Sequence, residues 1–101
     1  MKKQNMTLNE LIEQVEDEQS FLVFVKALEQ DRRAEENAQR EKPIDAFGRG
    51  PEGWENHGIV EFLEAATAWA ESTNFGLSQG LSESNVWQRI AAYLYCGKIY
   101  E

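Results

Sequence analysis

Apolar residues recur every three or four positions in four stretches of the chain, which is the period of an amphipathic α-helix. The four stripes are Leu8, Leu11, Ile12 and Val15; Phe21, Phe24, Val25 and Leu28; Ile59, Phe62, Leu63, Ala66, Trp69 and Ala70; and Trp87, Ile90, Ala91 and Leu94. No stretch shows a convincing period-two alternation of a strand. The pattern therefore predicts an all-α fold, a compact domain of four helices.

Polar residues mark the ends of the first two predicted helices. Thr7-Leu8-Asn9-Glu10 has the form of a capping box and starts a helix over about 8–16. Asp17 or Ser20 can act as the N-cap of the second helix. Because the second half of that helix is rich in charged residues, we expect it to project from the core into water until Pro43 ends it.

The last two helices have similar signals at their ends. Asn56 is expected to cap the third helix, with Trp54 just before it packing back onto that helix. Ser82 or Ser84 is expected to cap the fourth helix. Gly97 suits the left-handed residue that closes a helix, so we expect the fourth helix to end there.

A long glycine-rich loop, residues 42–55, separates the second and third predicted helices. Within it, residues 48–53 match the GxGxxG pattern of dinucleotide-binding loops letter by letter. That motif works only between a strand and a helix, where backbone N–H groups point at a pyrophosphate. Here Pro51 removes one donor and Glu52 places a negative charge at the phosphate position, so we interpret the match as accidental.

The chain is expected to form one helical domain over residues 7–101, preceded by a flexible leader, residues 1–6. The longest apolar run, residues 21–25, is far shorter than the ~20 residues that cross a bilayer. No apolar stretch of a signal peptide follows the start, and the single cysteine, Cys96, suits a reducing compartment. These features favour a cytoplasmic protein.

Acidic residues outnumber basic ones, with 18 Asp and Glu against 10 Lys and Arg and a net charge of −8. This balance argues against binding to nucleic acid or to an anionic membrane, because both need a basic patch. Residues 10–18 and 52–71 contain acids and no Lys or Arg. If the first and third helices pack side by side, they form one acidic face that attracts a basic protein partner. The candidate partner-binding residues are Glu10, Glu13, Glu16, Glu61 and Glu64.

The sequence offers little for catalysis, and we expect a protein that is not an enzyme and uses no cofactor or metal. His57 is the only histidine, and zinc sites need three or four convergent ligands. Cys96 lies at the end of a helix where the dipole disfavours a thiolate. Two alternatives to a protein-interaction module stay open. One is a small-ligand or metal-binding domain that uses His57, Glu61 and the glycine-rich loop, and the other is a structural homodimer.

A set of spaced residues adds a family resemblance. They are Phe21-Leu22-x-Phe24 with Leu28, Trp54-x-Asn56, Phe62-Leu63-Glu64-Ala65 with Trp69, Trp87 with Ala91, and Gly97-Lys98-x-Tyr100-Glu101. Over about residues 20–101 the chain resembles a family of small bacterial proteins of unknown function. The resemblance supplies no catalytic residue. It implies a role like that of relatives that act as protein-binding or toxin-neutralising partners, in the manner of an immunity or inhibitor protein.

Overall fold

The computed structural model describes residues 6–40, 50 and 52–100 of the 101-residue chain. In chain order the elements are α1 (Leu8–Gln14), α2 (Glu18–Gln39), α3 (Ile59–Thr73), the short 3-10 helix η1 (Leu77–Gln79) and α4 (Val86–Ile99). No strand occurs among the described residues, so the predicted all-α, four-helix fold is confirmed. The leader up to residue 5, Pro43 and most of the glycine-rich loop lie outside the described residues.

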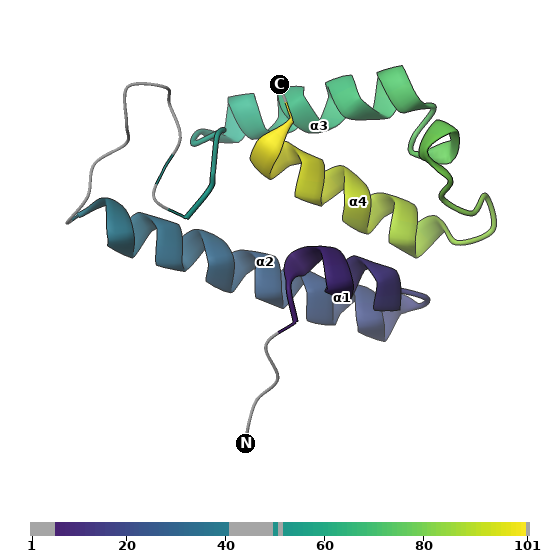
Figure 1. The fold of residues 1–101 in the computed structure, drawn as a ribbon, viewed down its shortest axis with the longest axis horizontal. Helices are drawn as coiled ribbons and strands as arrows, with labels where there is room; N and C mark the ends of the chain where they lie inside the picture. The colour runs from purple at the N-terminus through teal and green to yellow at the C-terminus, as the bar shows by residue number, and fades with distance from the viewer. Residues whose placement is uncertain (1–5, 41–49, 51, 101) are drawn as a thin grey trace.

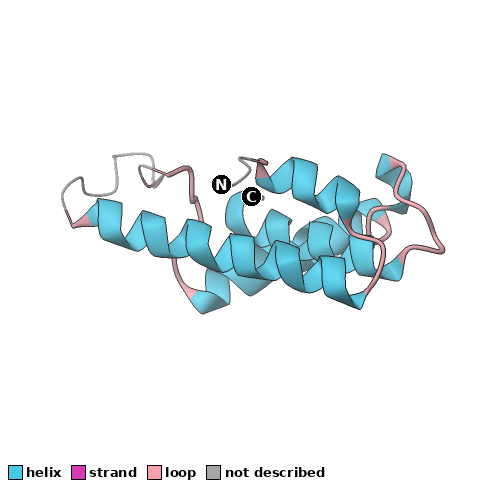
Figure 2. Cartoon of the chain, turned by 90° about the horizontal axis from the view of Figure 1, so that it is seen from below, coloured by secondary structure: helices cyan, strands magenta, loops and turns pink. Residues whose placement is uncertain are grey.

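The central element of the fold is α4, which packs against α1, α2 and α3. Figure 1 shows α2 and α3 on opposite sides of α4, and the backbones of α2 and α3 do not contact each other. The molecule is flat, with extents of 43 × 38 × 18 Å, and Figure 2 shows its thin edge. None of the described helices is long and apolar enough to span a bilayer.

Local capping chemistry sets the start of the first two helices. The Thr7 hydroxyl accepts from the Glu10 N–H at 3.1 Å, and the Glu10 carboxylate accepts from the Thr7 N–H at 2.8 Å, which confirms the predicted capping box. Asp17 is the N-cap of α2 and forms a second capping box with Ser20. The first helix ends at Gln14, earlier than the predicted 16, because Val15 turns into the core with an extended backbone.

The predicted caps of α3 and α4 are wrong. Gly58 is the N-cap of α3, and the Asn56 amide instead donates to the neighbouring C-terminal end of α4, as described below. Asn85, rather than Ser82 or Ser84, caps α4 by accepting from the Gln88 N–H at 3.0 Å. Its amide also donates to the Val15 carbonyl at 2.9 Å, so one side chain joins two helix ends.

Gly97 does not close α4 either. The helix continues through it to Ile99, and Tyr100 is the C-cap, with an extended backbone. The glycine is required for packing rather than for a left-handed turn, because a Cβ at this position would lie 2.7 Å from the Phe62 ring of α3. The close approach of α3 and α4 therefore depends on the missing side chain.

The core joins α1, α2 and α4 with the segment that precedes α3. Its buried members are Ile12, Val15, Phe24, Leu28, Trp54 and Ala91. Trp69 is 2% exposed, in line with its predicted core position, and Trp54 stacks on Phe62 of α3 as expected. Trp87, predicted to face the core, is 38% exposed and lies against Phe21, with ring centroids 5.3 Å apart.

Two further residues of the predicted apolar stripes are not covered. Ile59 is 79% exposed and Leu63 48% exposed, although both follow the helical spacing of the α3 core positions. The reason is the position of α2, which packs on α4 and leaves this side of α3 open. The fold therefore has apolar surface that no described element of the chain buries.

Candidate functional site

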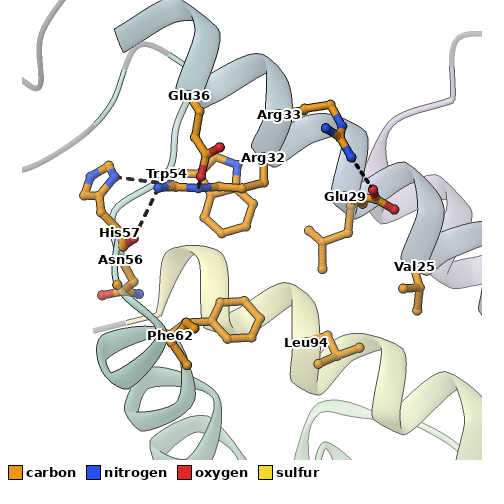
Figure 3. A pocket seen from close by; sticks show the side chains of 13 residues that line it. Val25, Glu29, Arg32, Arg33, Glu36, Trp54, Asn56, His57, Phe62 and Leu94 are labelled. Carbon is orange, nitrogen blue, oxygen red and sulfur yellow. Dashed lines mark hydrogen bonds and ion pairs between the residues drawn. The ribbon is translucent and has the colours of Figure 1, made fainter. Parts of the chain in front are cut away.

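An open groove of about 520 Å³ lies where α2, α4 and the start of α3 meet (Figure 3). It is lined by Val25, Leu28, Glu29, Arg32, Arg33, Glu36, Trp54, Asn56, His57, Gly58, Ile59, Phe62 and Leu94. The α2 members span residues 25–36, about three helical turns. Apolar side chains from α2, α3 and α4 face each other across the groove, and charged side chains of α2 form its edge.

Trp54 forms one wall of the groove and is almost completely buried. The guanidinium of Arg32 lies 5.0 Å and the ammonium of Lys98 5.7 Å from its ring centroid. The indole N–H donates to the Asp31 carboxylate at 2.8 Å, and Lys98 Nζ donates to the same oxygen at 2.7 Å. Asp31 of α2 therefore binds both Trp54 and Lys98, and so links the segment before α3 and the C-terminal turn of α4 to α2.

Arg32 and His57 form the polar end of the groove. Arg32 donates through Nε to Glu36 at 3.2 Å and through Nη2 to the His57 carbonyl at 3.2 Å. His57 Nδ1 lies 3.4 Å from Arg32 Nη1 and 3.3 Å from Gln39 Nε2. The histidine is thus held against α2 by several polar contacts, and its ring belongs to the wall of the groove.

Glu35 lies beneath this wall and has no solvent exposure. Its Oε1 accepts from the Glu52 N–H at 3.0 Å and from the Trp54 N–H at 3.4 Å, and its Oε2 accepts from Gln39 Nε2 at 2.7 Å. A Cβ on Gly50 would collide with the carboxylate, so the turn that covers it requires a glycine there. Burial of Glu35 corrects the expectation that this half of α2 projects into water, because one face is covered while Glu29, Arg33 and Glu36 on its other side are exposed.

The C-terminal end of α4 is held by the segment that leads into α3. The Asn56 side-chain amide donates to the carbonyls of Gly97 and Tyr100, both at 3.0 Å, and the Glu55 N–H donates to the Lys98 carbonyl at 3.0 Å. These bonds satisfy carbonyls that have no partner within the helix. They explain why the Trp-x-Asn and Gly-Lys-x-Tyr patterns occur in one sequence, because the two patterns meet in space.

The five carboxylates singled out from the sequence, Glu10, Glu13, Glu16, Glu61 and Glu64, are all exposed. The α1 and α3 helices make no contact, so the two acidic groups do not form the single face that side-by-side packing would have given. Glu10 takes part in the α1 capping box, and the Glu61 carboxylate folds back over Gly58 at the start of α3.

Residues proposed for the ligand-binding alternative are brought together only in part. His57 lines the groove, whereas Glu61 does not, and most of the glycine-rich loop is outside the described residues. In residues 6–40, 50 and 52–100 no three His, Cys, Asp or Glu side chains are placed to hold a metal ion. Burial raises the pKa of the Cys96 thiol to about 11, which keeps it protonated and unreactive at neutral pH.

The sequence interpretation missed Asp31, Arg32 and Glu35, because the charged tract that contains them was taken as a solvated surface. One signal was available. Positions 24, 28, 31 and 35 continue the alternating spacing of four and three that marks the buried side of α2. A polar residue on a continuing apolar stripe indicates a buried and hydrogen-bonded side chain, as it is here.

The family model that matches this chain covers residues 17–101 and is described as a family of unknown function (DUF7660). No curated protein and no solved structure shows significant similarity to the chain. The match spans α2, α3, η1 and α4 and so includes every residue that lines the groove.

Proposed function

This chain belongs to the DUF7660 family, whose function is unknown, and we propose that it is a non-enzymatic protein-interaction module. The observation that carries the proposal is the open groove between α2 and α3, floored by α4. Small soluble domains seldom leave contiguous apolar surface uncovered unless a partner uses it. In this proposal the groove binds an apolar segment of a partner protein in the cytoplasm.

A protein segment fits the groove better than a small molecule. Small-ligand pockets bury most of the ligand's surface. Here one side is open to solvent, and the apolar surface continues from Ile59, which lines the groove, to Leu63, one turn further along α3 and outside the groove. A partner that lies along the surface covers both residues, whereas a small molecule in the groove leaves Leu63 in water.

The charge of the chain supports a basic partner, as an immunity or inhibitor protein would have. At a net charge of −8 the field of the whole molecule speeds encounter with a positively charged protein. In this division of roles the carboxylates Glu10, Glu13, Glu16, Glu61 and Glu64 steer the partner. The groove then determines how long the complex lasts, since short-range apolar contacts act mainly on dissociation.

The test is affinity capture from the lysate of the native host with three forms of the chain. These are the wild type, Ile59→Gln, and the neighbouring Val60→Gln as a matched control. Both side chains are strongly exposed, at 79% and 63%, so neither change disturbs the fold, but only Ile59 lines the groove. The proposal expects a protein retained by the wild type and by Val60→Gln and reduced with Ile59→Gln.

A second comparison separates the effect of the acidic residues on association from the effect of the groove on dissociation. Replacing the five glutamates by glutamine is expected to slow association and to flatten its salt dependence, with little change in dissociation. Ile59→Gln is expected to speed dissociation, with little change in association. Equal retention by all forms would refute the groove as the binding site, and a Tm raised by a metabolite instead of a protein would favour the small-ligand alternative.

A further inference from the structure

The α2 wall of the groove is a helical stripe that faces α3 across the groove without contacting it. Its groove-lining residues recur every three or four positions from Val25 to Glu36, over about 16 Å of helix. Two helices bury such a stripe by packing with their axes about 8–10 Å apart. The neighbouring helix α4 contributes Leu94 to the floor, and α3 contributes Phe62 and Ile59 to the opposite side. The groove therefore has the length and lining that receive about three turns of an amphipathic helix.

The charges inside the groove are already balanced. Arg33 pairs with Glu29 at 2.6 Å and Arg32 with Glu36 at 3.2 Å, each pair one turn apart on α2. The arginines therefore offer an acidic partner little net attraction. The opposite wall of the groove is different, because α3 contains three glutamates and no Lys or Arg.

From this combination we infer that the occupant of the groove is a basic amphipathic helix of the partner protein, an inference that rests on the proposed function. Its apolar stripe packs against Val25, Leu28 and Leu94 on one side and against Ile59 and Phe62 on the other. Its Lys and Arg residues lie at the margins of the stripe, in the negative field of α3 and of a chain with a net charge of −8. A helix with acidic margins meets like charge there and binds more weakly.

The probes are three labelled peptides of about 18 residues, which as helices exceed the length of the groove. The first has leucines at helical spacing on a lysine background. The second keeps the same leucines on a glutamate background. The third has the composition of the first with leucine and lysine in strict alternation, which destroys the helical stripe. Binding is followed by fluorescence anisotropy at low and at high salt, on the full chain.

The inference expects the first peptide to bind at least roughly tenfold more tightly than either of the others at low salt. Ile59→Gln is expected to weaken that binding by roughly tenfold, the loss of one buried aliphatic side chain, and Val60→Gln to leave it unchanged. Charge neutralisation of the five glutamates is expected to reduce association and to leave dissociation close to that of the wild type.

The outcomes distinguish this inference from the function on which it rests. If the glutamate peptide binds as well as the lysine peptide and depends on Ile59, the groove is a protein-binding site but its partner is not basic. If the alternating peptide binds equally well, the attraction is to charge alone and no helix is recognised. If no peptide binds and capture from lysate is also unaffected by Ile59→Gln, both the inference and the proposed function are wrong.

Discussion

Replacing Glu35 tests whether a single buried carboxylate holds the groove wall onto α2. Glu35→Ala removes the acceptor of the Glu52 and Trp54 N–H groups and of the Gln39 amide. Gln39 can turn to water, and the Glu52 N–H is partly buried, so the main penalty falls on the buried Trp54 N–H. An unsatisfied buried donor costs about 1–3 kcal/mol.

The lost packing adds to this penalty. Glu35 has no exposed surface, and the substitution removes one buried methylene, Cγ, which contributes about 0.8 kcal/mol. Relief from burying a charge offsets part of the total. We therefore expect Glu35→Ala to lower the free energy of unfolding by about 2 kcal/mol, a sizeable share of the ~5–15 kcal/mol of a small domain.

Glu35→Gln is expected to cost much less, about 1 kcal/mol. Its amide oxygen can still accept from the two backbone N–H groups, and the Gln39 side chain can turn over to present its carbonyl to the new NH₂ group. The matched control is Glu36→Ala, one residue on, which removes only a partly exposed ion pair with Arg32. Such pairs contribute about 0–1 kcal/mol.

The assay is urea unfolding followed by far-UV circular dichroism, together with amide hydrogen exchange at Glu52 and Trp54. The expected order of stability is wild type, then Glu36→Ala and Glu35→Gln close together, and Glu35→Ala well below. Exchange at the two amides is expected to accelerate in Glu35→Ala beyond the change in global stability. A Glu35→Ala midpoint equal to that of Glu36→Ala would refute the structural role of the carboxylate.

Three further predictions concern the packing of the helices and the buried thiol of Cys96. Gly97→Ala is expected to destabilise the fold in urea despite the ~1 kcal/mol that alanine gains in a helix, because its Cβ meets the Phe62 ring; Phe62→Leu in the same chain should recover part of the loss. Trp69→Ala is expected to cost ~3–5 kcal/mol and Trp87→Ala clearly less, since Trp87 keeps 38% of its surface exposed; equal urea midpoints would contradict this. Burial raises the Cys96 pKa from 9.0 to about 11, so its contribution to stability is complete below pH 9 and is lost as the pH rises toward 11. Urea midpoints of the wild type and Cys96→Ala should therefore converge over that range.

Much of the fold could be predicted from the sequence because it depends on residues close together in the chain. The helical spacing of apolar residues located all four helices, and capping boxes located the starts of α1 and α2. A capping box joins residues three apart, so its geometry is present in any chain that adopts that local conformation. The acidic surface is likewise a matter of composition.

Failures of the sequence interpretation occur where one segment meets another that is distant in the chain. Asn56 has the character of an N-cap, yet its amide bonds the end of α4, more than 40 residues away. Gly97 has the character of a helix terminator, yet it lies within α4, where the absence of a side chain lets the Phe62 ring pack against the helix. In both cases the local preference is worth about 1 kcal/mol, and tertiary contacts outweigh it.

The candidate groove likewise depends on contacts between segments that are distant in the chain. The amphipathic pattern assigns Ile59, Leu63 and Trp69 to the same buried stripe. Periodicity shows which residues share a helix face, but it does not show what covers that face. Only the packing of α2 and α3 on opposite sides of α4 leaves the groove open. By itself the sequence determined the helices and the negative charge. The tertiary structure decided which apolar residues stay in water, since burial depends on the neighbours that the whole chain brings together.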